Sequence, residues 1–247
     1  MDWFGNIKID GKRTMTNTPG FDDKVLGDPR NKLKYAFGET PLRKMTVLVA
    51  RTLLKGFVTM HVEGAENIPQ VGACILASNH LSNFDVIPMQ LAIKRPLFFM
   101  GKAELFKNSF LSWFFRQMGG FPVQRGANDQ WALSHAREVI GRGLILAMFP
   151  EGTRSRGKGL SVAKTGAARL AIEKNIPIIP LSHFGSEFVL RDFPKRTLVT
   201  IKISAPIMPA DDDDPLSLTD KVMFALASEL PEGMRGVYSE NPSGFTF

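Results

Sequence analysis

The chain contains 247 residues, and its 31 Lys and Arg against 24 Asp and Glu give a formal net charge of +7. This length fits one domain or two small ones, and the 44% hydrophobic and 22% charged residues are close to ordinary globular usage. The composition excludes a disordered, collagenous or disulfide-framework protein, since the single cysteine, Cys74, cannot form an internal disulfide.

The positive charge predicts an anionic partner, which allows nucleic acid, anionic lipid or a phosphorylated metabolite. The sequence shows no aromatic-studded basic module of the RNA-binding kinds, so we expect no nucleic-acid partner. The start of the chain, MDWFGNIKID, lacks the basic segment and apolar run of a secretory signal peptide. No clean run of 18 apolar residues occurs, so we expect no membrane-spanning helix.

Residues 1–40 are polar and show little hydrophobic periodicity, which predicts a poorly defined N-terminal arm. A helix is expected next, within residues 41–56, where Lys44, Arg51 and Lys55 lie on one helical face. Two interpretations of this basic stripe stay open. It is typical of an interfacial amphipathic helix in the lipid headgroup region, and equally of a helix packed on its own domain with solvated cations.

Predicted strands and helices alternate through the rest of the chain. Short apolar or alternating runs predict strands at residues 57–62, 73–78, 97–100, 121–123, 144–149, 176–181 and 198–203. Helical spacing predicts helices at residues 86–93, 103–118, 129–142, 162–174 and 216–230. The alternation predicts an α/β fold, with a single domain at residues 57–231 built on a mostly parallel mixed sheet covered by helices. Residues 232–247 are expected to form a C-terminal tail.

The segment Asn79–Asp85 (NHLSNFD) directly follows a predicted strand. A histidine with a nearby carboxylate can act as a general base, because the carboxylate orients the ring and stabilises the imidazolium. Residues five apart do not share a helical face. His80 and Asp85 therefore meet only if His80 lies in the turn and Asp85 in the first turn of the next helix. The alternative is a purely structural hydrogen bond.

Three further segments carry distinctive residues. Glu151–Arg154 (EGTR) follows another predicted strand, where a glycine turn can point a carboxylate and a guanidinium into one cleft. Arginine is suited to bidentate phosphate binding, and Arg125 at the end of a glycine-flanked apolar stretch is placed for an anion. Ile176–Pro180 (IPIIP) has no reactive group, so we expect it to shape an apolar wall.

Several known site patterns are absent from the sequence. There is no G-x-S-x-G nucleophile elbow, no G-x-x-x-x-G-K-[ST] phosphate loop and no H-E-x-x-H metal helix. His61, His135 and His183 lack metal-ligand spacing, so we expect no metal site. Cys74 lies in an apolar run and is expected in the core, not as a nucleophile.

Together and in this order, the four segments resemble the glycerolipid acyltransferase family. The family's N-H-x-x-x-x-D, G-x-x-F-x-x-R, E-G-T-R and V-P-[IV]-[IV]-P blocks match Asn79–Asp85, approximately Gly119–Arg125, Glu151–Arg154 and Ile176–Pro180. Lys102 and Glu104 also resemble the family's K-x-E-L stretch, and the resemblance covers about residues 57–205. It identifies residues 57–231 as an acyltransferase domain.

The resemblance implies transfer of a fatty acyl group from an acyl thioester to the free hydroxyl of lysophosphatidic acid, giving phosphatidic acid. His80 would be the general base, oriented by Asp85, and backbone N–H groups near the start of the following helix would stabilise the oxyanion. The substrate-binding residues that it implies are Lys102, Arg125, Glu151, Gly152, Thr153 and Arg154. No metal or bound cofactor is required, because the thioester is a substrate.

The partners implied are acyl-CoA or acyl-carrier protein as donor, a lysophospholipid acceptor and an anionic membrane surface. The resemblance favours the interfacial interpretation of residues 41–56, which places the enzyme at the cytoplasmic face of the membrane, peripheral or monotopic. The alternatives are an acyltransferase acting on glycerol-3-phosphate or another lysophospholipid, or a non-catalytic lipid-binding protein.

Overall fold

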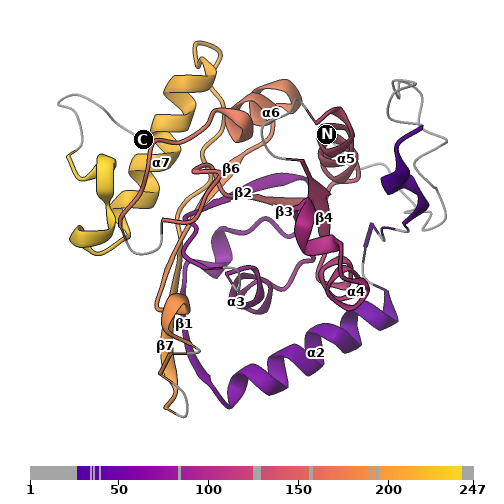
Figure 1. Cartoon of the computed structure of the whole chain (residues 1–247). Helices are drawn as coiled ribbons and strands as arrows, with labels where there is room; N and C mark the ends of the chain where they lie inside the picture. The colour runs from indigo at the N-terminus through magenta and orange to yellow at the C-terminus, as the bar shows by residue number, and fades with distance from the viewer. Residues whose placement is uncertain are drawn as a thin grey trace.

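A seven-stranded sheet with the strand order β1-β7-β6-β2-β5-β3-β4 organises the chain (Figure 1). The computed structural model describes residues 27–240 except 34, 36, 39, 83–84, 125–128, 156–157, 190 and 193–194. The strands are β1 (Val58–Glu63), β2 (Cys74–Ser78), β3 (Leu97–Lys102), β4 (Gly120–Val123), β5 (Ile145–Met148), β6 (Ile178–Phe184) and β7 (Thr197–Ile203). All neighbours pair in parallel except β6 and β7, which are antiparallel. The expected mostly parallel mixed sheet is confirmed.

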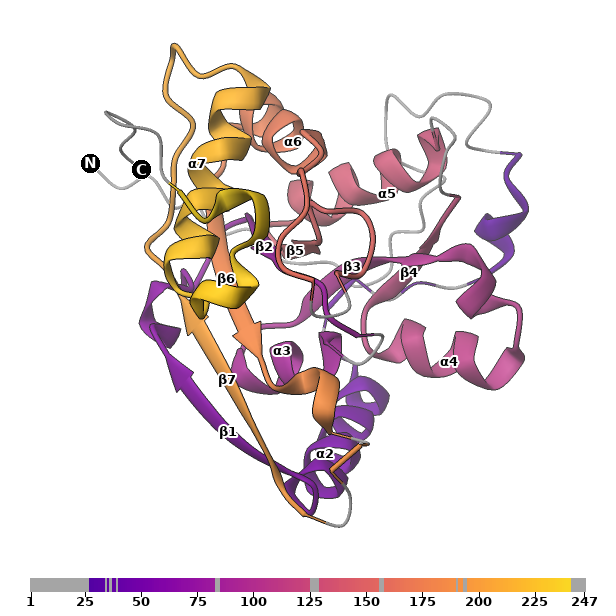
Figure 2. The ribbon, with the colours of Figure 1, turned by 60° about the vertical axis from the view of Figure 1, so that its left-hand side comes forward.

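Six α-helices in the described part of the chain cover the two faces of the sheet (Figures 1 and 2). One layer holds α5 (Gln130–Gly141), α6 (Gly166–Lys174) and α7 (Pro215–Ser228). The other holds α2 (Pro41–Lys55), α3 (Val86–Ala92) and α4 (Ser109–Gln117). Short 3₁₀ turns are η2 (Pro29–Lys32), η3 (Ala65–Asn67), η4 (Ala103–Phe106), η5 (Ser186–Phe188), η6 (Glu232–Met234) and η7 (Gly236–Tyr238).

The apolar runs form the centre of the sheet because they are covered on both faces. All five residues of β2 are buried: Ile75 and Ala77 belong to the core below one helix layer, and Cys74 and Leu76 to the core below the other. Parallel strands covered by helices on both sides require such continuous apolar sequences. Cys74 is a core residue, as expected, and burial raises the pKa of its thiol to about 11.

Two predicted helices differ from the structure for local reasons. The stretch 103–118 divides into η4 and α4, because the Asn108 side chain caps α4 by accepting hydrogen bonds from the N–H groups of Phe110 and Leu111. The stretch 162–174 becomes helical only at Gly166. Before it, the Lys164 N–H donates to the Pro150 carbonyl, which holds this segment against the β5 loop.

The ends of the described chain are tied to the domain. In the predicted arm, Arg30 forms an ion pair with Asp129, the N-cap of α5, at 2.6 Å. In the predicted tail, Met234 and Val237 exchange main-chain hydrogen bonds with Leu160. Among the described residues, no helix combines the length and the apolar composition that crossing a membrane requires.

Candidate active site

The carboxyl ends of β2 and β5 bring the two main sequence segments together. These strands are parallel neighbours, with Ala77 paired with Met148, so the loops that follow them leave the same edge of the sheet. Functional groups in α/β sheets gather at this edge. The Ser155 N–H donates to the His80 carbonyl at 2.8 Å, which joins the two loops directly.

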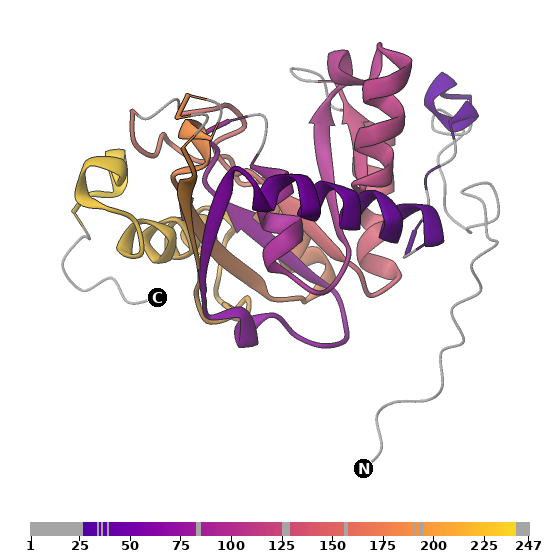
Figure 3. The same cartoon turned by 90° about the horizontal axis from the view of Figure 1, so that it is seen from below.

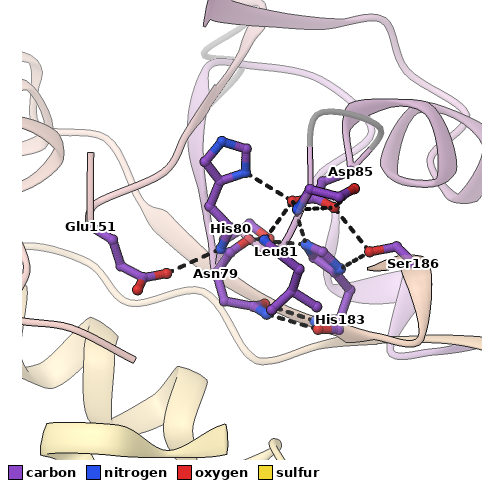
Figure 4. Close-up of polar contacts among 9 residues, drawn as sticks. Asn79, His80, Leu81, Asp85, Glu151, His183 and Ser186 are labelled. Carbon is purple, nitrogen blue, oxygen red and sulfur yellow. Dashed lines mark hydrogen bonds and ion pairs between the residues drawn. The ribbon is translucent and has the colours of Figure 1, made fainter. Parts of the chain in front are cut away.

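His80 lies in the turn after β2, and Asp85 directly precedes α3. The Nδ1 atom of His80 lies 2.8 Å from Oδ2 of Asp85 (Figure 4). The fully buried carboxylate of Asp85 also accepts hydrogen bonds from the Leu81 N–H, the Ser82 N–H and hydroxyl, and the Ser186 hydroxyl, at 2.7–3.0 Å. This is the geometry in which the sequence allows the two residues to meet.

The surroundings of Asp85 keep it ionised. Burial opposes ionisation, but the nearby His183 and hydrogen bonds from His80 and Ser82 outweigh it and lower the pKa of Asp85 to about 2. A carboxylate only accepts hydrogen bonds, so the proton between the two residues belongs to Nδ1 of His80. The Nε2 atom of the neutral ring is then an acceptor, which is the state that a general base requires.

The ring and main chain of His80 are held on several sides. Its N–H donates to Oε1 of Glu151 at 3.1 Å, and its ring stacks on Phe149 with centroids 4.1 Å apart. The other oxygen of Glu151 accepts from the N–H and hydroxyl of Ser161. The buried Glu151 therefore connects the two loops through hydrogen bonds to His80 and Ser161.

A pocket of about 540 Å³ opens beside His80, whose side chain is 12% exposed. Apolar side chains form much of its wall, among them Phe99, Met100, Phe115 and Met148. Basic side chains line it as well: Lys102, Arg154 and Lys164. An apolar cavity with a base and several cations suits a ligand that has an acyl chain and an anionic group.

The predicted substrate-binding residues take different positions. Lys102, Gly152 and Arg154 line the pocket, with Lys102 also 3.4 Å from Glu104, whereas Glu151 and Thr153 are not among its lining residues. Arg125 lies outside the described residues, so its role stays a prediction. Gly152 has a φ of +66°, and a Cβ there would approach the Lys164 side chain to 3.1 Å, so this position favours glycine.

Three residues at the site were missed by sequence reasoning. Lys164 lies 13 positions beyond Glu151 and enters the pocket because its loop returns to Pro150. His183 and Ser186 follow β6, which pairs with β2 and so ends beside the His80 turn. No spacing rule links these positions; only the strand order does.

Some of the backbone N–H groups that were expected to stabilise the oxyanion already donate hydrogen bonds within the protein. The N–H groups of Leu81 and Ser82, near the start of α3, donate to Asp85. These two groups therefore orient the carboxylate instead of facing a reacting carbonyl. Among the described residues, no three His, Cys, Asp or Glu side chains are grouped in a way that could hold a metal ion.

Comparisons with known proteins point to one family. Residues 59–183 match the family model described as Acyltransferase. The 1-acyl-sn-glycerol-3-phosphate acyltransferase of Escherichia coli K12 is 35% identical over 114 residues, which are 44% of this chain and 46% of that protein. The enzyme of the same name from Streptococcus pneumoniae R6 is 28% identical over 191 residues, 72% of this chain and 69% of that one.

A solved structure shares the fold. The crystal structure of the 1-acyl-sn-glycerophosphate (LPA) acyltransferase PlsC from Thermotoga maritima superimposes with a TM-score of 0.63 at 27% identity. The match covers 74% of this chain and 76% of that one, and it confirms the predicted α/β fold. The chloroplastic relative from Brassica napus matches over 38% of its length, so this chain spans less than half of that relative and of the E. coli one.

Proposed function

The chain belongs to the Acyltransferase family, and from this premise we propose that it transfers a fatty acyl group from an acyl thioester to lysophosphatidic acid, giving phosphatidic acid. The observation that carries the proposal is the contact between His80 and Asp85 at the wall of a pocket that combines apolar and basic side chains. Relatives named as 1-acyl-sn-glycerol-3-phosphate acyltransferases support this choice of acceptor.

The chemistry follows from the protonation of His80. Nε2 removes the proton from the acceptor hydroxyl as its oxygen attacks the thioester carbonyl, and Asp85 stabilises the imidazolium that forms. The tetrahedral intermediate collapses, the C–S bond breaks, and the thiolate takes the proton from Nε2. The products are an ester and a thiol, and His80 returns to its neutral state without an acyl-enzyme.

In this proposal the basic side chains of the pocket bind the acceptor phosphate. Arg154 and Lys164 follow the Gly152 turn by two and twelve residues, and both line the pocket with Lys102. Arginine and lysine are suited to phosphate, the first by its planar fork and the second as a point charge. The donor in this proposal is acyl-CoA or acyl-carrier protein, with its acyl chain against the apolar wall.

We place the enzyme on an anionic membrane surface, at the cytoplasmic face, through α2. This helix packs Arg43 and Ala50 inward, and the Arg43 guanidinium donates to Gln90 Oε1 and to the Leu97 carbonyl. Its outward face exposes a set of large apolar side chains: Leu42, Met45, Leu48, Val49 and Leu53. The basic stripe lies between these two faces, and α2 contains no acidic residue.

The helix α4 extends this surface. It contacts α2, contains no acidic residue, and exposes Phe110, Leu111 and Trp113. Seen from below, α2 lies in front of the other described elements, with α4 beside its N-terminal part (Figures 1 and 3). Phe115 of α4 lines the pocket, so the apolar surface and the site share one helix. Apolar side chains beside cations are what an interfacial helix presents to lipid.

Vesicle binding tests this placement. The Leu48→Ser/Leu53→Ser variant is expected to bind phosphatidylglycerol vesicles at least about ten-fold more weakly, because two large apolar groups no longer enter the lipid. Val71→Ser is the matched control, since Val71 is equally exposed but lies in the loop before β2. Equal binding by wild type and the double variant would refute the role of α2.

Acyl transfer from radiolabelled acyl-CoA to lysophosphatidic acid in mixed micelles tests the function. Wild type should form phosphatidic acid, and His80→Ala should lower kcat about 10²- to 10⁴-fold because the base is lost. His61→Ala is the control, as His61 is an exposed residue of β1 paired with Glu63. Glycerol-3-phosphate, a lysophosphatidylcholine and acyl-carrier protein as donor serve as parallel assays. Lipid binding without transfer in any of them would favour a non-catalytic role.

A further inference from the structure

His183 is a fully buried histidine directly behind the proposed base pair (Figure 4). It lies near the end of β6, and its main chain is bound to the Asn79 side chain: the amide NH₂ donates to the His183 carbonyl at 2.8 Å, and the His183 N–H donates to Oδ1 at 2.9 Å. Asn79 and His80 are adjacent, so this clamp fixes the imidazole of His183 against the His80 turn.

The partners of the two ring nitrogens determine the protonation of His183. Nε2 lies 2.9 Å from the carbonyl oxygen of Asn79, which can only accept, so Nε2 carries a proton. Nδ1 lies 3.3 Å from the hydroxyl oxygen of Ser186, whose single proton is donated to Oδ1 of Asp85 at 2.9 Å. With its proton directed to Asp85, the Ser186 oxygen offers His183 only a lone pair, and this arrangement favours a proton on Nδ1 as well.

A ring that is protonated at both nitrogens is an imidazolium. Its Nε2 lies 3.7 Å from Oδ2 of Asp85, so the buried carboxylate has a buried cation beside it. A cation that is fully removed from water is stabilised only by close anionic and hydrogen-bonding partners, and Asp85, Asn79 and Ser186 supply these.

We propose that His183 is a positioning residue that acts on His80 through Asp85, as a permanent imidazolium that holds the carboxylate directly and through Ser186. This inference rests on the proposed function, because it assigns His80 the role of base. The cation shares the negative charge of Asp85 with His80. It thereby fixes the carboxylate and moderates how strongly Asp85 favours the charged form of His80.

Charged groups on the surrounding elements define the electrostatic setting. Asp85 faces His183 from the start of α3, and His80 lies beyond it on the other side of the carboxylate. Glu151 of the β5 loop binds the His80 main chain, and Glu187 belongs to η5 with Ser186. Removal of the His183 charge leaves Asp85 acting on His80 alone, which favours protonated His80 and moves the acid limb of kcat/KM to higher pH.

Nuclear magnetic resonance of the full chain tests the protonation state without any assay of activity. Labelling with ¹⁵N-histidine, with His183 assigned by comparison with His183→Gln, should show both ring nitrogens of His183 protonated at neutral pH. A non-protonated nitrogen in His183 at neutral pH would overturn the proposal, whatever the outcome of the acyl-transfer assay.

Kinetics test the action on His80. His183→Gln keeps a donor for the Asn79 carbonyl but removes the charge, so kcat should fall about ten-fold and the acid limb should move up by about half a pH unit or more. Ser186→Ala is a smaller change that serves as the test if His183→Gln fails to fold. It should also lower kcat.

The matched control is His135→Gln, at a second buried histidine whose ring lies among aromatic side chains on α5. It should lower the melting temperature and leave the acid limb in place. An unchanged acid limb and kcat in folded His183→Gln and Ser186→Ala would show that His183 is only structural. Inactive wild type with an imidazolium at His183 would instead contradict the proposed function and leave the protonation result standing.

Discussion

Two buried histidines on opposite faces of the sheet have different surroundings. His183 belongs to what we term the Asp85 network, formed by Asn79, His80, Ser82, Asp85, His183 and Ser186. His135 belongs to what we term the His135 cluster, with Tyr35, Phe37, Phe121 and Trp131 at ring-centroid distances of 4.3–5.1 Å. The His183 ring has an oxygen atom within 3.3 Å of each nitrogen, and the His135 ring contacts mainly ring faces and edges.

Burial decides the charge in the His135 cluster, whereas hydrogen-bonding and charged partners decide it at Asp85. Burial, with a smaller effect of Arg142, lowers the pKa of His135 to about 3, so this ring stays neutral. Burial also disfavours the charge of Asp85, but there the surrounding donors and His183 prevail and lower the pKa to about 2. The sheet therefore carries an ionised network on one face and a neutral aromatic cluster on the other.

The largest expected effect comes from Asp85→Asn, which removes the charge at the centre of the Asp85 network. We expect kcat to fall at least about 10²-fold, because the His80 ring loses the acceptor that sets its tautomer. The folded-state pKa of Asp85 is about 2, below its ordinary 3.8, so ionisation adds stability above pH 4 that is lost as pH falls through 2. This linkage corresponds to about 2 kcal/mol.

Urea unfolding at pH 7 and pH 3 measures the second part of this prediction. The difference in free energy of unfolding between wild type and Asp85→Asn should be larger at pH 7 than at pH 3. Activity within two-fold of wild type would remove Asp85 from the mechanism, and a pH-independent difference would mean that the carboxylate is not preferentially ionised in the folded state.

Local sequence signals predicted most of the fold and half of the Asp85 network. Apolar or alternating runs located the seven strands to within a few residues. The central strands β2 and β5 are mostly apolar because helices cover both of their faces. The N-H-x-x-x-x-D spacing located His80 and Asp85, since both belong to one turn. Ser186 and His183 could not be found in this way: they lie about 100 residues further along and reach Asp85 only because β6 pairs with β2.

The direction of a side chain was the other quantity that spacing did not predict. The family resemblance implied Glu151 as a substrate-binding residue, and in the structure its carboxylate accepts hydrogen bonds from His80 and Ser161. Pro122, which has no N–H to donate, lies within β4. This position is tolerated because β4 is an edge strand, where a missing N–H donor need not leave a neighbouring strand unpaired.

A smaller effect on activity is expected from the basic side chains that line the pocket beside the Asp85 network. Lys164→Ala should raise KM for lysophosphatidic acid about ten-fold with little change in kcat, because one cation near the acceptor phosphate is lost. Lys164→Arg should recover much of the affinity. Arg169→Ala on the solvent side of α6 is the matched control, since Arg169 is exposed and bonds Thr165.

A monoacylglycerol acceptor separates phosphate binding from other causes. This acceptor has the hydroxyl but no phosphate, so Lys164→Ala should leave its KM close to that of wild type. An equal rise in KM for both acceptors would mean that Lys164 supports the Gly152 turn, beside which its side chain lies, and does not bind phosphate.

The smallest effect on activity is expected in the His135 cluster, where a change should alter only the pH dependence of stability. His135 titrates near 6.5 in the unfolded chain but near 3 when folded, so its contribution is present above pH 6.5 and is lost as pH falls. By pH 5 this costs wild type about 2 kcal/mol. His135→Phe should keep kcat, because His135 lies on α5, in the helix layer opposite α3, and should unfold with a flatter pH profile between pH 7.5 and 5. Phenylalanine also replaces a ring whose buried Nδ1 has no hydrogen-bond partner in the described chain. If wild type and His135→Phe had equal pH profiles of stability, His135 would be protonated in the folded protein. The aromatic cluster would then not hold a neutral histidine, and the contrast with His183 would be wrong.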